Sequence, residues 1–235
     1  YMAGYRKNSP LDNAQMVIHL GDIYNWFSPL NIPDIVLPLC MNGNKFVPYI
    51  QIRGNHEYRG TDPGGFFRYF GTENEQSYFA FTAGDAIFIV LDTGEDKPDS
   101  DIEYAGITQY DLYRTEQSEW LASILESTEY KEAPFKIIVA HIPPAVTEAG
   151  PDEDWHGNVE VEQKFMPLLR QAYPDLMLCG HLHRFVRHDA TDKTSFPVVV
   201  NSNTSLLRIY ATTTQMKIEV MDRDGKMLDE FIIKK

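Results

Sequence analysis

Cysteine is nearly absent from this chain of 235 residues, which contains only Cys40 and Cys179. Two thiols do not form a disulfide framework, and their separation is not that of a metal site. Cys179 lies in an apolar run, so we expect it to be a buried small hydrophobic residue. Cysteine usage therefore indicates neither an oxidising nor a reducing compartment.

Long apolar runs and basic residues are scarce as well. No apolar stretch approaches the roughly 18 residues of a membrane-spanning helix, so we expect no membrane span. The chain has 21 Lys and Arg against 34 Asp and Glu, which gives a formal net charge of -13. A surface of this sign repels phosphate backbones, so a general nucleic-acid binder is not expected. A small phosphorylated substrate is still compatible, because a metal ion can invert the local field.

The start of the chain has no recognisable signal peptide, and its first residue is Tyr1, not Met. We therefore expect the chain to be a piece of a longer protein. Its composition is that of an ordinary globular protein, with 43% hydrophobic and 23% charged residues. At this length we expect residues 1–235 to form a single domain that is truncated at its N-terminus.

Short apolar runs followed by turn signals recur over most of the chain. Such near-continuous runs predict strands that are buried on both faces of a layered α/β core. They span residues 16–20, 47–52, 86–91, 135–140 and 176–179. Between them, apolar residues at helical spacing predict one helix with Thr115 as its N-cap and another from Val161 that ends before Pro174. A shorter helix is expected over residues 34–39.

From Phe185 onward the pattern changes to short β-rich runs. They span residues 198–200, 206–211, 216–221 and 227–233, with a hairpin turn expected at Asp224-Gly225. We therefore expect an antiparallel, β-rich C-terminal end. Two acidic, irregular loops, 94–106 and 148–158, are long enough to border a functional site, although they can equally be solvated surface loops.

Four short polar clusters follow the ends of predicted strands. Polar residues just past the carboxyl ends of buried strands converge on one rim of an α/β sheet. The clusters supply a carboxylate, an amide oxygen and imidazoles, which are the groups that divalent metal ions bind. They are Gly21-Asp22, Gly54-Asn55-His56-Glu57, His141, and Gly180-His181-Leu182-His183.

Each cluster alone also has a structural interpretation. Asp22 can be a helix cap, and residues 54–57 can form a turn, because Gly and Asn favour turns. His141 can be a hydrogen-bonded core histidine, and His181 and His183 can be a pair on an edge strand. The joint pattern is more specific, because four of the seven histidines fall in these clusters, each at a strand end.

Taken in this order, the four clusters resemble the motifs of the calcineurin-like metallophosphoesterases: Gly-Asp, Gly-Asn-His-Glu/Asp, a lone His, and Gly-His-x-His. Weaker similarity continues at Leu91-Asp92 and at Gln117 with Trp120-Leu121. The resemblance implies an α/β fold in which a two-sheet sandwich is flanked by helices and carries a dinuclear metal centre at its rim.

The resemblance also implies roles for individual residues. Asp22 would bridge two metal ions, and Asn55, His141 and His181 would complete one of the two sites. His183 would bind the other ion. His56 would face the substrate as a general acid or transition-state stabiliser, and Glu57 would orient it.

Two features depart from the family pattern. The first motif of the family, Asp-x-His, is absent, and we interpret His19 as a strand residue. The second metal site is then incomplete in this chain, either because the motif lies upstream or because the protein has lost half of its centre. Purple acid phosphatases, the branch towards which the sequence leans, have an iron-bound Tyr where this chain has Asn25. We therefore expect Tyr24 to pack or to line the rim, and Asn25 to hydrogen-bond to the catalytic histidine.

The sequence thus predicts metal-dependent hydrolysis of phosphomonoesters or diesters, with a hydroxide activated by two metal ions and with His56 assisting. The ligand set suits Zn, Mn and Fe alike, and the resemblance to acid phosphatases favours a secreted or periplasmic protein. The alternative is a non-catalytic binding or scaffold member of the same fold. Substrate contacts are left open: the residues near the motifs, each of which can equally be structural, are Trp155, His156, Arg53, Arg59 and Arg184.

Overall fold

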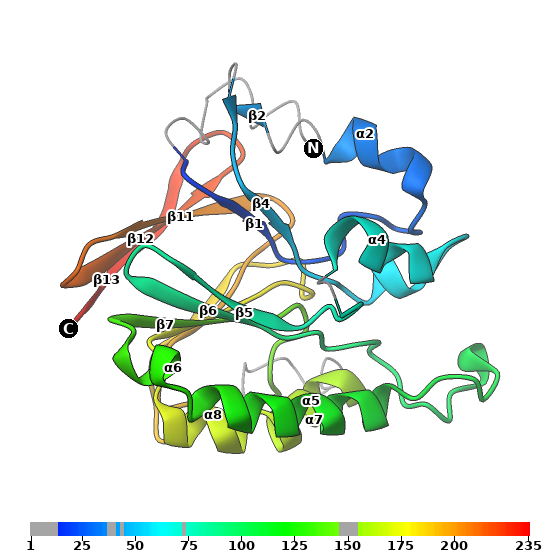
Figure 1. The fold of residues 1–235 in the computed structure, drawn as a ribbon. Coiled ribbons are helices and arrows are strands. Elements are labelled where there is room, and N and C mark those ends of the chain that lie inside the picture. The colour runs from blue at the N-terminus through cyan, green and yellow to red at the C-terminus, as the bar shows by residue number, and fades with distance from the viewer. Residues whose placement is uncertain (1–13, 37–40, 43–44, 72–73, 146–154) are drawn as a thin grey trace.

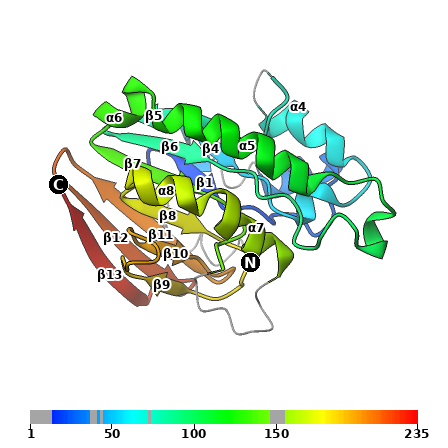
Figure 2. The ribbon, with the colours of Figure 1, turned by 90° about the horizontal axis from the view of Figure 1, so that it is seen from below.

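The largest unit of the structure is a six-stranded sheet with the strand order β5-β6-β7-β8-β10-β9, part of which is labelled in Figure 1 and all of which is labelled in Figure 2. The structure is a computed structural model that describes residues 14–36, 41–42, 45–71, 74–145 and 155–235. Strands β6, β7, β8 and β10 are parallel, whereas the edge strands β5 and β9 are antiparallel to their neighbours. The strands are β5 (Phe79–Ala83), β6 (Ala86–Val90), β7 (Phe135–Val139), β8 (Leu176–Cys179), β9 (Val186–His188) and β10 (Val198–Val200).

Helices cover one face of this sheet, as Figures 1 and 2 show from two directions. They are α5 (Tyr110–Leu125), α6 (Thr128–Glu132), α7 (His156–Lys164) and α8 (Met166–Ala172). Leu121 of α5 and Leu169 of α8 belong to the same buried cluster as Ile87 and Ile89 of β6. Because successive strand residues point to opposite faces, the intervening Phe88 packs on the other side of the sheet.

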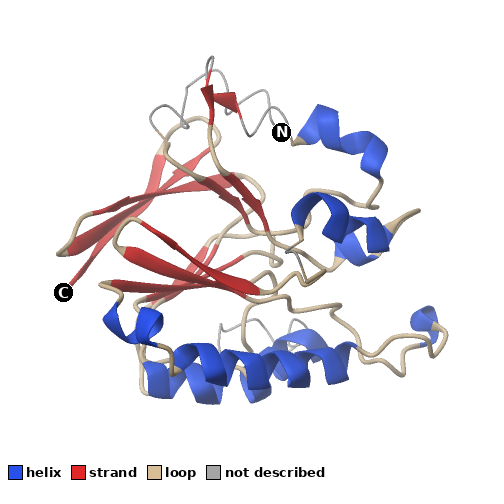
Figure 3. Cartoon of the chain, viewed as in Figure 1, coloured by secondary structure: helices blue, strands red, loops and turns tan. Residues whose placement is uncertain are grey.

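A second layer of strands covers that other face. It contains the parallel pair β1 (Val17–His19) and β4 (Tyr49–Gln51), and the antiparallel sheet of β11 (Ser205–Ala211), β12 (Gln215–Asp222) and β13 (Met227–Lys234). Met216, Ile218 and Val220 alternate along β12 and pack into the core between the layers. The predicted two-sheet α/β sandwich with flanking helices is therefore confirmed (Figure 3).

Shorter elements lie beside the β1–β4 pair. They are η1 (Pro29–Asn31), α2 (Ile32–Ile35), η2 (His56–Tyr58), η3 (Pro63–Gly65), α4 (Phe66–Phe70) and the two-residue strands β2 (Met41–Asn42) and β3 (Lys45–Phe46), with η4 (Ile102–Tyr104) in the loop before α5. Tyr24, Phe27 and Phe66 form a separate buried cluster here. The expectation that Tyr24 packs is thus confirmed.

The antiparallel C-terminal end is confirmed for β11 to β13, with the Asp224-Gly225 turn between the last two strands. For residues 198–200 the expectation holds only in part, because β10 pairs antiparallel with β9 but in parallel with β8 and so belongs to the central sheet. All three of its valines are buried, which is typical of a strand covered on both faces. Strand β5, which forms a hairpin with β6 across the Gly84-Asp85 turn, was not predicted.

The helix expected to begin at Thr115 in fact begins at Tyr110. The Asp99 carboxylate accepts hydrogen bonds from the backbone nitrogens of Tyr110 and Asp111, at 2.8 and 3.0 Å, and so caps the helix from the preceding loop. Thr115 lies inside the helix, where its hydroxyl donates to the Asp111 carbonyl oxygen. The cap was misplaced because Asp99 is distant in sequence.

The second predicted helix is divided into α7 and α8 at Phe165. Pro167 lies in the first turn of α8, where its missing N–H prevents a continuous hydrogen-bond ladder. The expected end before Pro174 is confirmed. The short helix expected over residues 34–39 is replaced by α2, and positions 37–40, including Cys40, lie outside the described residues.

Cys179 is fully buried, as predicted. None of the helices in the described ranges combines the length and the apolar character needed to cross a membrane.

Candidate metal centre

The carboxyl ends of strands from both layers meet at one edge of the sandwich. Asp22 follows β1, Asn55 follows β4, His141 follows β7, and His181 follows β8. The structure therefore brings together residues that are up to 159 positions apart in the sequence.

The chain turns sharply where it delivers these side chains. Gly21, Asp22, His181 and His183 all have left-handed backbone conformations, with φ of 87°, 56°, 71° and 54°. A Cβ at Gly21 would lie 2.5 Å from Nδ1 of His141, so only glycine fits between β1 and that ring. Three non-glycine residues in this conformation indicate a strained rim, which is common at functional sites.

Nε2 of His141 faces two oxygen atoms. It lies 3.0 Å from Oδ2 of Asp22 and 3.1 Å from Oδ1 of Asn55. Its other ring nitrogen, Nδ1, lies 2.6 Å from the Leu20 carbonyl oxygen and must donate there, because a carbonyl only accepts. The unprotonated nitrogen of neutral His141 is therefore Nε2, and its lone pair points at the other candidate ligands.

The side chain of His181 completes the group. Ligand atoms of Asp22, His141 and His181 lie within 4.8 Å of one another, and the two imidazole rings are 5.2 Å apart between centroids. Two oxygens and two imidazole nitrogens form a donor set that suits a divalent ion such as Zn, Mn or Fe. The residues present therefore fit one metal ion of the kind that the sequence predicted.

The amide of Asn55 is oriented by two acidic residues that the sequence analysis missed. Nδ2 of Asn55 donates to Oδ2 of Asp96 at 3.3 Å and to Oε2 of Glu95 at 3.5 Å. Because both carboxylates bind the nitrogen end, the oxygen end is turned towards His141. Glu95 and Asp96 follow β6 in the acidic loop 94–106, which was expected to border either a functional site or solvent, and Asp96 does line the cavity described below.

Glu57 has a different role from the expected one. Its carboxylate accepts from the backbone nitrogens of Asp22, Tyr24 and Gly54, at 2.8, 3.1 and 2.7 Å. Glu57 therefore ties the loop after β1 to the loop after β4 and does not contact the His56 ring. Burial raises the pKa of Glu57, and the nearby Asp22 carboxylate adds to this rise.

His56 is oriented by a backbone group. Its Nδ1 lies 3.1 Å from the Asn25 carbonyl oxygen, so Nδ1 donates and Nε2 is left towards the site, 4.0 Å from Oδ2 of Asp22. Asn25 thus contacts the histidine, but through its main-chain carbonyl oxygen and not through the side chain that was expected to form this hydrogen bond. The backbone nitrogen of His56 also donates to Oδ1 of Asp22 at 2.9 Å.

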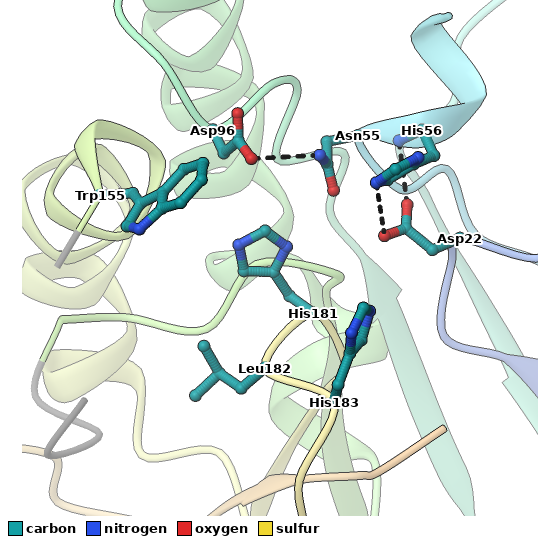
Figure 4. A pocket seen from close by; sticks show the side chains of 8 residues that line it. All are labelled: Asp22, Asn55, His56, Asp96, Trp155, His181, Leu182 and His183. Carbon is teal, nitrogen blue, oxygen red and sulfur yellow. Dashed lines mark hydrogen bonds and ion pairs between the residues drawn. The ribbon is translucent and has the colours of Figure 1, made fainter. Parts of the chain in front are cut away.

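These side chains border a cavity of about 260 Å³. In Figure 4, the His181 ring lies near the middle, with Trp155 and Leu182 on one side and Asp22 and His56 on the other. The complete lining set is Asp22, Asn55, His56, Asp96, Trp155, His181, Leu182 and His183. His183 thus borders the same cavity, but it does not belong to the group formed by Asp22, His141 and His181.

Charges within the group shift its pKa values strongly. Burial alone would lower the pKa of His141, but the adjacent Asp22 carboxylate outweighs burial and raises it to about 9. For Asp22, burial would raise the pKa, but His141 holds it well below its usual range. Burial, reinforced by His141, lowers the pKa of His181 to about 3 and that of His19 to about 4.

Asp111, His156 and Glu160 form a second group of potential ligands between α5 and α7. Its carboxylates already have partners within the protein: Arg114 and His156 contact Asp111 at 2.9 and 2.8 Å, and Lys164 contacts Glu160 at 2.6 Å. His156 is therefore a structural residue, whereas its neighbour Trp155 lines the cavity. Arg53 is structural too, because it is buried and lies 3.6 Å from the Tyr58 ring centroid.

Comparisons with known proteins identify the family and the fold. A sequence model of the calcineurin-like phosphoesterase family matches residues 3–185. The human serine/threonine-protein phosphatase CPPED1 is 22% identical over 143 residues, which cover 60% of this chain and 43% of the human protein. The chain thus spans less than half the length of this curated relative.

Three solved structures share the fold at low sequence identity. Purple acid phosphatase PPD1 from yellow lupin superposes with a TM-score of 0.68 at 17% identity, over 99% of this chain and 48% of that chain. A dimetal phosphatase from Danio rerio has a TM-score of 0.66 at 15% identity, over 99% and 86%. GAP50, the anchor in the inner membrane complex of Plasmodium, has a TM-score of 0.72 at 13% identity, over 99% and 82%.

Proposed function

The chain belongs to the calcineurin-like phosphoesterase family, and from this premise we propose that it hydrolyses small phosphoesters, monoesters or diesters, in a metal-dependent reaction. The observation that carries the proposal is the convergence of Asp22, Asn55 and His181 on Nε2 of His141, the ring nitrogen that carries the lone pair when the ring is neutral. We assign these four residues as ligands of one metal ion. We assign Asp22 and His183 to a second ion in the same cavity.

Metal ions held by these side chains would supply Lewis acidity and a water of lowered pKa. The residues of the chain contribute orientation. The Leu20 carbonyl oxygen fixes the tautomer of His141, and Glu95 with Asp96 fixes the amide of Asn55. Glu57 holds the backbone of Asp22 and Tyr24 against that of Gly54, so that the loop carrying Asp22 is in place before a substrate binds.

His56 is the residue that handles the leaving group in this proposal. Its Nδ1 hydrogen is committed to the Asn25 carbonyl oxygen, and its Nε2 borders the cavity beside Asp22. When Nε2 is protonated, it can donate to a phosphoryl or leaving oxygen. The leaving alcohol then departs neutral, without the cost of forming an alkoxide.

The test is hydrolysis of p-nitrophenyl phosphate and bis(p-nitrophenyl) phosphate with added Mn, Zn or Fe. We expect His141→Ala and His181→Ala to lower kcat/KM at least hundredfold and to reduce bound metal. His188→Ala on β9 is the matched control, because this histidine lies outside the cavity-lining set, and it should keep both metal and activity.

A non-catalytic binding role is the second candidate. Within the described residues, only Asp22 and His183 are assigned to the second ion, and GAP50, an anchor protein, has a similar fold. Protein that carries its full complement of metal ions and hydrolyses neither probe would favour this role over catalysis.

A further inference from the structure

Arg59 lies directly beside the candidate site, at the end of η2. Its guanidinium forms a two-point ion pair with Glu95, with Nε 2.8 Å from Oε1 and Nη2 2.7 Å from Oε2. The Glu95 side chain is only 2% exposed, whereas that of Arg59 is 33% exposed. The pair therefore fixes a guanidinium whose outer part is open to solvent.

The remaining nitrogen, Nη1, points to the catalytic histidine. It lies 3.4 Å from Nε2 of His56, and Nη2 lies 3.7 Å from Oδ1 of Asp96. His56 and Asp96 both line the cavity. The Arg59 guanidinium thus lies at the edge of the cavity, between the lining residues His56 and Asp96.

A guanidinium has five N–H groups in one plane, and the contact with Glu95 uses two of them, one on Nε and one on Nη2. Nη1 is left for His56: because Nδ1 of His56 donates to Asn25, Nη1 donates to Nε2 of the neutral ring at 3.4 Å. A phosphoryl oxygen would replace this contact when Nε2 carries a proton. An oxygen atom placed about 2.8 Å from Nε2 of His56 can also lie about 2.8 Å from Nη1, because the two nitrogens are 3.4 Å apart. One phosphoryl oxygen can therefore accept from both residues.

We propose that Arg59 is a substrate-binding residue that contacts a phosphoryl oxygen together with His56, with Glu95 as the residue that positions it. The proposal rests on the proposed function, because it assigns a further contact in the same site. Glu95 also contacts the amide of Asn55, so one carboxylate holds both a candidate metal ligand and the anion-binding group. Glu95 neutralises much of the guanidinium charge, so the contact acts as a directed hydrogen bond more than as a long-range attraction.

The experiment measures binding of inorganic phosphate to the metal-loaded chain, together with kcat and KM for p-nitrophenyl phosphate and with metal content. For Arg59→Ala we expect the phosphate Kd and the KM to rise tenfold to hundredfold, the range for losing one charge-assisted hydrogen bond. Metal content should stay at the wild-type value, because Arg59 contacts none of the assigned ligands. Glu95→Gln should raise KM less, because the amide oxygen still accepts one hydrogen bond from Arg59.

Arg170→Ala is the matched control. Arg170 is 28% exposed and pairs with Glu162 on α7, outside the cavity-lining set, so its loss should leave Kd and KM unchanged. Should Arg59→Ala not fold, Arg59→Gln carries the test, because its amide can still donate to Glu95 while it cannot reach Nη1's position.

Unchanged phosphate Kd and KM in a folded Arg59 variant would overturn the proposal, as would loss of metal from that variant. Active wild-type protein with an unaffected Arg59 variant would reject this contact alone. Conversely, wild-type protein that binds phosphate through Arg59 but hydrolyses neither probe would support the contact and reject the proposed hydrolysis.

Discussion

Gly54 lies where the loop after β4 touches the loop after β1. A Cβ at this position would lie 2.5 Å from the backbone nitrogen of Asp22 and 2.9 Å from Oε2 of Glu57, and closer still to Oδ1 of Asp22. These neighbours are backbone and an anchored carboxylate, so they cannot rotate away. The two loops can therefore pack this closely only because Gly54 has no side chain.

Gly54→Ala should displace Asp22 and break hydrogen bonds that the Glu57 carboxylate accepts from the backbone, lowering the free energy of unfolding by about 1–3 kcal/mol. Metal affinity should fall with it, which titration with Mn or Zn measures. Gly64→Ala is the control, because a Cβ there meets no atom within 4 Å. Equal metal affinity in the two variants would contradict the assignment of Asp22 as a ligand.

At the scale of residues, the sequence identified the candidate ligand side chains but not the groups that orient them. The candidate ligands could be selected because Asp22, Asn55, His141 and His181 combine suitable donors with positions at strand ends. The carbonyl oxygens of Leu20 and Asn25, which fix the two histidine tautomers, could not, because every residue has one. The role of Glu57 was misjudged for the same reason, since its partners are backbone nitrogens.

At the scale of elements, Arg114 connects α5 to the loop that carries Glu95. It is fully buried, its Nε donates to the Thr93 carbonyl oxygen at 2.8 Å, its Nη1 contacts Asp111 at 2.9 Å, and its Nη2 donates to the Glu95 carbonyl oxygen. The loop that orients Asn55 is therefore held from within a helix.

Arg114→Leu leaves these carbonyl oxygens buried without a donor, so we expect the free energy of unfolding to fall by about 3 kcal/mol. Urea denaturation measures the change. Lys131→Ala breaks an exposed pair with Glu126 and should cost less than about 1 kcal/mol. A loss for Arg114→Leu no larger than for this control would show that the loop does not depend on α5.

The helix α5 shows why the ends of an element were harder to predict than its existence. The apolar spacing of Trp120, Leu121 and Ile124 was enough to identify α5. Its start was not, because the cap comes from Asp99, eleven residues before Tyr110. The residues next to the helix start do not reveal a capping contact from a residue this far away in the chain.

At the scale of the whole molecule, the fold followed from buried strands with converging ends. The runs at 86–91, 135–140 and 176–179 are apolar on both faces, and this pattern itself predicts a covered parallel sheet. The position of β10 was missed because Val198–Val200 is equally compatible with an edge hairpin and with a central strand. Pairing between distant strands is decided by tertiary packing, which three residues do not specify.

The histidines of the site should give the metal-free protein a stability maximum near pH 6.5. The folded-state pKa of His141 is raised to about 9 by Asp22, so its contribution is complete below about pH 6.5 and is lost as the pH rises to 9. A shift of this size amounts to roughly 3 kcal/mol. Burial lowers the pKa of His181 to about 3 and of His19 to about 4, so stability should also fall below pH 6.5, where the unfolded chain binds protons more readily.

Urea denaturation of chelator-treated protein between pH 5 and 9 measures this profile. His141→Gln should flatten the alkaline limb, which separates the effect of His141 from that of Glu57, whose pKa burial also raises. Added Zn or Mn should reverse the alkaline slope, because a metal ion competes with the proton for Nε2 of His141 and binds more tightly as the pH rises. Constant or rising stability of the metal-free protein from pH 6.5 to 9 would show that Asp22 does not hold a charged His141, and the proposed ligand cluster would lose its electrostatic basis.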